Sequence, residues 1–460
     1  MNNLKSICTL LALAAILSLG SCGGDEKKRE EKKAEVSVAE VYANLEALNF
    51  PKKEQTLRTD SLDLYVDYST CVADAKGSAY FNAVRPTFVH CSPNYYSIKG
   101  KNIKLETNDK QKVYDLFATI REVNNADIKE AARRIVAGDK QAILITDAEY
   151  YRGGVAGFNT NNPYLAPEIQ TWLEKGHDLY VYSENYLEKG KYNKFRYYMI
   201  FTDDRIENDL NEIFAKNAPK DLGVKSLHLT SKAPAVTFSE EYPVANEAAT
   251  FDKETYISHK DNAVECQTYY TGWKDLYSYL VENAVDANGN PLAKGTPLVK
   301  GIYAKYNDNS IYKITEVGVR VTQMADAYLE ATDSLYNSSK IVKTHANMPE
   351  LSNIFSVDQD VFRQTGEICL HINKDLNLKP QLLTDRNNVL RVELYVAKAE
   401  DNFTNQPIAE SFKFETPTSK GELNRSFFES IRQMINNSPV VNPATSKQVI
   451  YTFYINSLEY

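Results

Sequence analysis

Hydrophobic and polar positions along residues 37–224 follow a pattern that predicts strands and helices in turn. Short apolar runs at 62–67, 141–147 and 179–182 have the length of buried strands. Between the first two, the segment 110–124 carries apolar residues at intervals of three and four, which is the spacing of one helix face. Strands alternating with helices favour an α/β domain with an open parallel sheet and helices on both faces.

The pattern changes after about residue 225 to strands and turns, interrupted by one amphipathic helix at 424–435. The pair Asn288-Gly289 is typical of tight hairpins and resembles turn sequences of bacterial immunoglobulin-like domains. We therefore expect residues 225–460 to form a β-rich, sandwich-like region, with an immunoglobulin-like fold as one candidate. The strand-like segments are 310–322, 368–372, 389–397 and 448–456.

Residues 1–21 have the form of a secretory signal peptide. One cation, Lys5, precedes an apolar run over 7–17 that is too short to span a bilayer comfortably. The run ends in Leu19-Gly20-Ser21-Cys22, which resembles the bacterial lipobox, whose cysteine is acylated before cleavage. The resemblance implies that acyl chains such as palmitate anchor Cys22 to a membrane. An ordinary signal peptide with a chance cysteine is the alternative.

Residues 22–36 are mostly charged and predict a solvated tether between the lipid and the first domain. The acidic pair Asp25-Glu26 resembles the export signal of Bacteroidetes-type outer-membrane lipoproteins, although basic residues surround it. The resemblance implies an outer-membrane location, with exposure at the cell surface as one outcome.

The composition of the chain argues against several classes of function. Of 460 residues, 43% are hydrophobic and 25% charged, which is ordinary for a globular chain. The net charge is −8 and no basic run occurs, so we expect no nucleic-acid partner. The cysteines and histidines lack zinc-site spacing. Four cysteines remain besides Cys8 and Cys22, and either disulfides or buried thiols fit them; they are Cys71, Cys91, Cys266 and Cys369.

Two predicted strands end in an acid: Asp67 closes 62–67, and Asp147 closes 141–147. Ligands of open α/β sheets bind at the carboxyl ends of the strands, so we expect these acids to share one edge. An acid in this position also caps the following loop by accepting backbone N–H bonds. Both roles remain open from the sequence.

The segment 61–216 resembles a von Willebrand factor type A domain. In that family the first strand ends in Asp-x-Ser-x-Ser and the central strand ends in Thr-Asp-Gly, and the two motifs hold a divalent ion for adhesion. Asp67, Ser69 and Asp147 match this pattern, whereas Cys71 and Ala148 replace a serine and the glycine. The resemblance implies a degenerate metal site for Mg²⁺ or Mn²⁺ whose coordination a partner's carboxylate completes.

The family also supplies a threonine ligand before a helix, at the position of residues 124–128 here. No threonine occurs there, although Asn125 or Asp127 offers an oxygen. After Asp147, the side chains of Tyr150, Tyr151 and Arg152 are candidates for ligand contact in a glycine-containing loop.

These features predict a cell-envelope lipoprotein that mediates binding to, or assembly with, a protein or glycan rather than an enzyme. The alternatives are a hydrolase acting on phosphate or glycan substrates and a scaffold with a non-functional metal site. A haloacid dehalogenase-type phosphatase would need a second acid where Ser69 stands. Two Asp-Ser-Leu triplets resemble an O-glycosylation sequon and make Ser61 and Ser334 candidate glycan sites.

The anchor leads to a direct prediction. The variant Cys22→Ala should appear in the soluble periplasmic fraction, because the acyl chains supply nearly all of the membrane affinity. Fractionation of cells that express the parent and the variant measures this. If the variant stays with the membranes after a high-salt wash, Cys22 is not the anchor.

Overall fold

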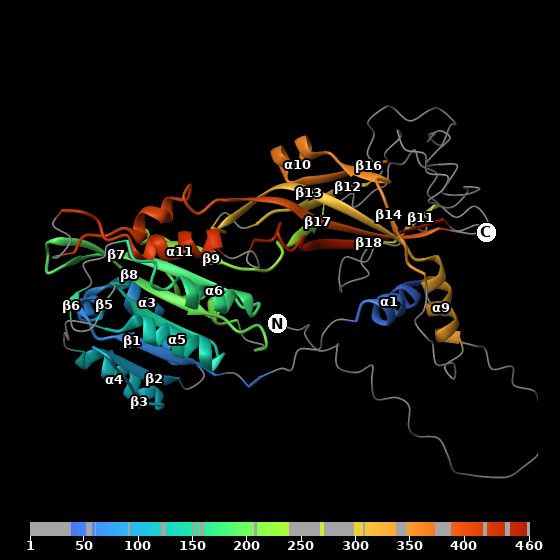
Figure 1. Ribbon diagram of the computed structural model, residues 1–460. Coiled ribbons are helices and arrows are strands. Elements are labelled where there is room, and N and C mark those ends of the chain that lie inside the picture. Colours follow the sequence, from blue (N-terminus) through green and yellow to red (C-terminus); the bar gives the residue numbers. More distant parts are fainter. Residues whose placement is uncertain are drawn as a thin grey trace, which may run out of the picture.

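The computed structural model describes most of the chain from residue 38 onward (Figure 1). The signal peptide with Cys22, the charged tether, Asn125, Tyr150, Cys91, Cys266 and the Asn288-Gly289 turn lie outside the described residues. The described ranges are 38–51, 58–59, 61–90, 93–120, 126–149, 151–152, 155–156, 161–206, 209–238, 267–270, 299–306, 309–336, 347–372, 388–416, 421–437 and 442–457.

A seven-stranded sheet with the order β3-β2-β1-β4-β8-β7-β9 forms the first part of the described structure. Its strands are β1 (Asp63–Asp67), β2 (Asn94–Lys99), β3 (Asn102–Thr107), β4 (Ala142–Thr146), β7 (Leu179–Glu188), β8 (Tyr192–Phe201) and β9 (Lys225–Leu229). Strand β1 pairs in parallel with β2 and β4, whereas the remaining neighbours pair antiparallel. The predicted α/β sheet is confirmed, but it is mixed rather than wholly parallel.

The antiparallel pairs arise because some connections between consecutive strands are very short. Only two residues separate β2 from β3, and only three separate β7 from β8. A parallel crossover needs a dozen or more residues, so connections this short form antiparallel hairpins.

Helices cover both faces of this sheet because β4 sends alternate side chains to opposite sides. Leu144 packs with α5 and α6 on one face, whereas Ile143 and Ile145 pack with α3, α4 and α7 on the other. Aspartates cap the starts of α4, α5 and α7. The helical segments are α2 (Thr70–Ala73), η1 (Asp74–Gly77), α3 (Ala79–Phe88), α4 (Lys110–Thr119), α5 (Ile128–Gly138), α6 (Ala166–Glu174) and α7 (Leu210–Asn217).

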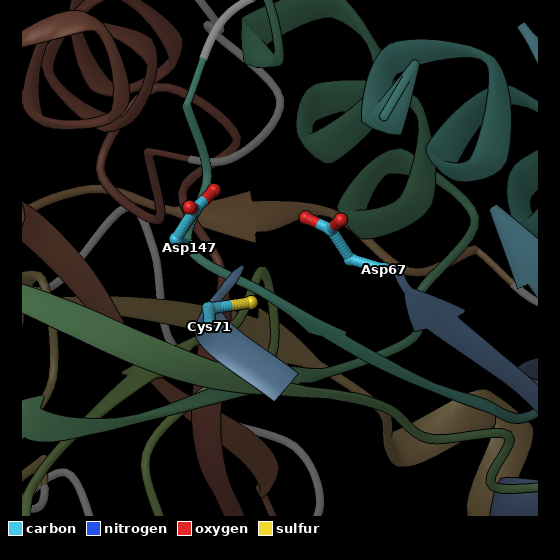
Figure 2. A group of neighbouring side chains, drawn as sticks. All are labelled: Asp67, Cys71 and Asp147. Atoms are coloured by element: carbon cyan, nitrogen blue, oxygen red, sulfur yellow. The ribbon is translucent and has the colours of Figure 1, made fainter. Parts of the chain in front are cut away.

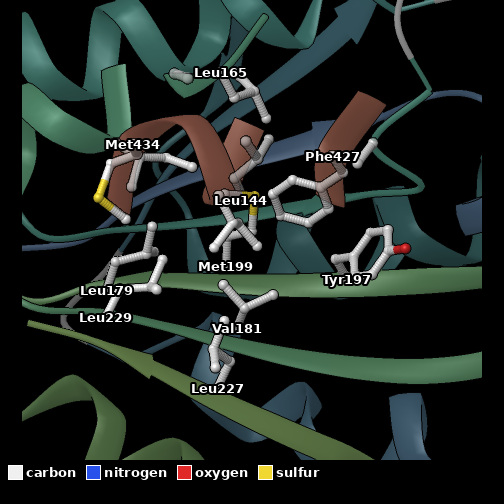
Figure 3. Close-up of a cluster of buried hydrophobic side chains, with 14 of the residues drawn as sticks. Leu144, Leu165, Leu179, Val181, Tyr197, Met199, Leu227, Leu229, Phe427 and Met434 are labelled. Atoms are coloured by element: carbon white, nitrogen blue, oxygen red, sulfur yellow. The ribbon is translucent and has the colours of Figure 1, made fainter. Parts of the chain in front are cut away.

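The C-terminal part of the chain returns to complete one of these faces. The predicted helix at 424–435 is α11 (Ser426–Asn437), and it packs beside α6 with the short helix η2 (Pro407–Phe412) nearby. Figure 3 shows Phe427 and Met434 of α11 close to Leu144 and Met199 of the sheet. This face is therefore closed by residues more than 200 positions away from most of the sheet.

The second part of the structure is β-rich, as predicted, and has two sheets around one core. One sheet has the order β10-β12-β16-β15, and the other has the order β11-β18-β17-β13-β14. All pairs among these described strands are antiparallel except β11 with β18. The bounds are β10 (Val236–Phe238), β11 (Gln267–Tyr270), β12 (Val299–Ala304), β13 (Tyr312–Gln323), β14 (Glu350–Leu351), β15 (Phe355–Val357), α10 (Gln359–Thr365), β16 (Glu367–Ile372), β17 (Val389–Asp401) and β18 (Val449–Ser457).

The first described helix, α1 (Val38–Asn49), lies on the five-stranded sheet rather than on the seven-stranded one (Figure 1). It pairs with α9 (Ala325–Tyr336). Glu46 of α1 accepts hydrogen bonds from Arg391 Nε at 2.7 Å and from Tyr454 Oη at 2.5 Å. The elements therefore do not group in space according to a single cut near residue 225, since α1 joins the β-rich part while β9 and α11 join the first sheet.

The contact between Glu46 and Arg391 predicts a stability effect. The variant Glu46→Ala should lower the free energy of unfolding by about 3 kcal/mol, because it leaves a mostly buried guanidinium short of one carboxylate. Chemical denaturation measures the change, with Ala47→Ser, an exposed position of the same helix, as the control. Equal stability of both variants would show that this ion pair does not stabilise the packing of α1.

Candidate functional site

Asp67 and Asp147 converge at one edge of the seven-stranded sheet, as the sequence predicts. Strands β1 and β4 are parallel neighbours, and Asp67 ends the first while Asp147 directly follows the second. Both acids are buried, with exposed fractions of 1% and 5%. Their carboxylates and the Cys71 thiol, shown in Figure 2, each offer a ligand atom within 4.8 Å of the others.

Hydrogen bonds already hold both carboxylates in place. Asp67 accepts from the backbone N–H of Ser69 and from Thr146 Oγ1, each at 2.8 Å. Asp147 accepts from the backbone N–H of Glu149 at 3.0 Å. These bonds confirm the capping role that the sequence left open, and they orient the two acids.

Ser69 and Cys71 complete the first loop of the site. The Ser69 hydroxyl is buried and donates to Cys71 Sγ at 3.2 Å. Cys71 is fully buried and carries a free thiol, so the buried-thiol alternative holds for it. Burial and the nearby Asp67 and Asp147 raise the pKa of this thiol well above its usual range, which keeps it protonated.

Three charged residues that sequence reasoning missed complete the cluster. Lys194 of β8 has an exposed fraction of 1%, and its ammonium lies 2.7 Å from Glu188 Oε2 and 2.8 Å from Glu149 Oε2. The same ammonium lies 3.7 Å from Asp147 Oδ2. The available signal was a pair of cations, Lys194 and Arg196, at alternate positions of a mostly apolar and aromatic strand.

A second buried ion pair supports the same loop. Arg196 donates to Glu184 at 2.7 Å and to the backbone carbonyl of Cys71 at 2.6 Å. Tyr198 donates to the same Glu184 carboxylate at 2.6 Å. This pair is neutral overall, so it fixes the position of the Cys71 loop without supplying charge to the acidic cluster.

The remaining charges are unbalanced. Asp147, Glu149 and Glu188 share the Lys194 ammonium, whereas Asp67 lies beside Asp147 and pairs with no cation among the described residues. Burial, together with the Asp147 charge, raises the pKa of Asp67 to about 7, although the hydrogen bonds from Thr146 and Ser69 oppose the shift. Burial lowers the pKa of Lys194, but the carboxylates of Asp147 and Glu149 outweigh this and raise it. The site therefore favours the uptake of a proton or another cation.

Ala148, which follows Asp147, has an unusual backbone conformation. Its φ of 55° lies in the left-handed region that favours glycine. The residue is fully buried, and its carbonyl accepts from Tyr164 Oη at 2.8 Å. The chain after Asp147 thus adopts a conformation typical of glycine at the position where von Willebrand A-like sequences have one.

The other predicted ligand residues are placed differently. Asp127 accepts from the backbone N–H of Glu130 at 3.1 Å and caps α5, so this oxygen serves the helix. Tyr151 and Arg152 lie in β5 (Tyr151–Arg152), which pairs with β6 (Val155–Ala156). The predicted loop after Asp147 is thus partly a small hairpin, and the directions of these side chains are not part of the described structure.

The two candidate glycosylation sites differ in their surroundings. Ser61 is partly exposed just before β1. Ser334 lies in α9, where its hydroxyl accepts from Asn44 Nδ2 at 2.6 Å and donates to the Ala331 carbonyl at 2.8 Å. A glycan on Ser334 would have to separate α1 from α9, which disfavours the prediction there.

A second cluster is formed by His177, Asp203 and Asp204. It lies at the opposite ends of the strands, before β7 and after β8. Arg205 binds Asp203 at 2.6 Å, and Lys232 binds Asp204 at 2.9 Å. Despite burial, the hydrogen bonds from His177 and Lys232 hold the pKa of Asp204 well below its usual range. Cations balance these acids, so this group is a structural ion-pair network.

Comparison with known proteins found no match to this chain among protein-family models, curated proteins or solved structures. No helix in the described part of the chain has the length and apolar content that a membrane span requires. The functional argument therefore rests on the geometry and charge of the site.

The raised pKa of Asp67 predicts a pH dependence. The folded-state pKa of about 7 lies above the ordinary value of 3.8, so the folded protein binds more protons between these values. In metal-free buffer, the contribution of Asp67 to the free energy of unfolding should thus fall as the pH rises from 4 to 7, by at most about 4 kcal/mol.

The variant Asp67→Asn should remove this contribution and flatten the profile, because a neutral amide can bond to both Ser69 and Thr146. Denaturation of parent and variant across this pH range measures the difference. Parallel profiles for the two proteins would contradict a protonated Asp67 in the fold.

Proposed function

We propose that this protein is a cell-envelope lipoprotein that binds or assembles with a protein or glycan partner through a divalent cation at the Asp67–Asp147 edge. One observation carries the proposal: Asp67 and Asp147 lie together at the ends of adjacent parallel strands, and the ammonium of Lys194 beside them is shared by Asp147, Glu149 and Glu188. A divalent cation would relieve their mutual repulsion, and an incoming carboxylate would complete its coordination.

The donor set suits a hard cation. Asp67, Ser69 and Asp147 would supply oxygens, which Mg²⁺ and Mn²⁺ prefer. The Cys71 thiol is protonated and soft, so it would line the site without binding such an ion. Glu149 is the further carboxylate within reach of the same ammonium as Asp147.

Two features support a von Willebrand A-like origin for this edge. The acids that match the two family motifs lie at the ends of neighbouring parallel strands, and Ala148, at the position of the motif's glycine, has a backbone conformation that favours glycine. Two features depart from the motifs, since Cys71 replaces a hydroxyl ligand and the threonine position is lost. The proposal is accordingly a weak cation site rather than a tight one.

The position of α1 favours presentation of this edge to a partner. The tether from Cys22 leads into α1, which lies on the five-stranded sheet. In Figure 1 the seven-stranded sheet lies on the other side of the molecule from α1. A lipid at Cys22 would thus hold the β-rich part nearest the membrane and leave the acidic edge remote from it.

A structural scaffold is the second candidate, and Lys194 favours it. Its ammonium already lies between Asp147, Glu149 and Glu188, where it partly replaces a metal ion. The hydrolase alternative has less support, because Ser69 stands where a phosphatase would place its second acid.

A metal titration separates the two candidates. The parent's melting temperature should rise with millimolar Mg²⁺ or Mn²⁺, since an ion that binds only the folded state adds about 2.7 kcal/mol at a hundred times its dissociation constant. The variant Asp147→Ala should lose this response and, through the lost cap, about 0.5–2 kcal/mol of stability.

The matched control is Asp109→Ala, which removes the acid that caps α4. It should cost a similar amount of stability while keeping the parent's response to metal. A parent whose melting temperature does not respond to either ion at millimolar concentration would support the scaffold and contradict the proposed cation site.

A further inference from the structure

A separate cavity of about 390 Å³ opens in the second part of the structure. It lies where the end of β12, the start of β13 and the end of α10 meet, beside Asn402. The lining residues are Ala304, Lys305, Tyr306, Tyr312, Lys313, Ile314, Phe362, Arg363, Gln364, Thr365, Gly366 and Asn402. The volume falls within the range of small-molecule sites.

The aromatic residues of the lining belong mainly to the hydrophobic cores. Tyr312 and Phe362 each have an exposed fraction of 3%. The hydroxyl groups of Tyr306 and Tyr312 donate to the Lys232 carbonyl at 3.0 Å and the Ile435 carbonyl at 3.5 Å. The accessible part of the wall is therefore mainly polar and suits a small hydrophilic ligand.

The charged part of the wall has one sign. Lys305, Lys313 and Arg363 are basic, and none of the described residues that line the cavity is acidic. This excess of basic side chains contrasts with the composition of the whole chain, which has 61 acidic and 53 basic residues. A cleft lined by positive charges alone produces a focused electric field that attracts anions into it.

Two acids lie close to these cations outside the lining. Asp360 binds Arg363 at 3.0 Å from one turn earlier in α10. Glu400 is the cross-strand partner of Lys313 in the β13–β17 pair, but its carboxylate binds Lys398 at 3.1 Å. Lys313 itself takes part in no ion pair among the described residues. Its ammonium is therefore the group best able to receive an anionic ligand.

The cavity also touches both hydrophobic cores. Tyr312 belongs to the core over the seven-stranded sheet, whereas Ile314 and Phe362 belong to the core of the β-rich part. A ligand in this cavity would therefore contact both parts of the molecule.

We propose that this cavity binds a small hydrophilic organic anion, whose carboxylate or phosphate is held by Lys313 and Arg363. The site is distant in sequence from the acidic edge and does not depend on the proposed cation there. A sugar acid and a sugar phosphate both have this chemistry, and the test distinguishes them.

The test is calorimetric titration of the full chain with glucuronate, glucose 6-phosphate, glucose and inorganic phosphate, in buffer without divalent ions. We expect one of the two sugar anions to bind more tightly than glucose and inorganic phosphate, because only it offers a negative charge to the cations and hydroxyl groups to the polar lining. The preferred anion shows whether the site takes a carboxylate or a phosphate.

The double variant Lys313→Gln/Arg363→Gln should weaken this binding about tenfold or more, through the loss of two charge-assisted hydrogen bonds. The control Lys110→Gln/Lys129→Gln removes the same charge from exposed positions of α4 and α5 and should bind as the parent does. Absence of binding by both sugar anions at millimolar concentration, or equal weakening in the two double variants, would overturn the proposal.

Discussion

Burial of like charges at the carboxyl end of the β1–β4 pair is the constraint on which the site depends. Parallel pairing of these strands forces Asp67 and Asp147 together, and the surrounding core excludes most of the water that would screen them. Three neighbouring features reduce the repulsion between these two carboxylates. Lys194 supplies a positive charge, backbone N–H groups and Thr146 donate to the carboxylates, and Asp67 has a pKa near neutrality.

Strand β8 connects this edge to the rest of the molecule. Lys194 and Arg196 point to the acidic cluster and the Cys71 loop, while the next residue, Tyr197, points to the opposite face, where its hydroxyl donates to the Ser411 carbonyl at 2.6 Å. The C-terminal segment that carries Ser411 thus packs against the same strand that supplies the cations. The strand that supplies the cations is therefore packed by a segment 214 residues further along the chain.

The sequence determined the elements and the candidate acids because these follow from local patterns. The apolar runs at 62–67 and 141–147 are β1 and β4, and the helical spacing at 110–124 contains α4. The amphipathic segment at 424–435 is α11, and the predicted later strands match β13, β16, β17 and β18 within a few residues. Convergence of Asp67 and Asp147 followed from a general rule for strand ends in α/β sheets.

Only the tertiary structure decided which distant elements meet. A period of two or 3.6 residues shows which face of an element is buried, but it does not name the partner of that face. The sequence therefore did not place α11 on the seven-stranded sheet or α1 on the five-stranded one. Lys194 was missed for the same physical reason: its contact with Asp147 depends on the antiparallel pairing of β4 with β8, which joins positions 47 residues apart.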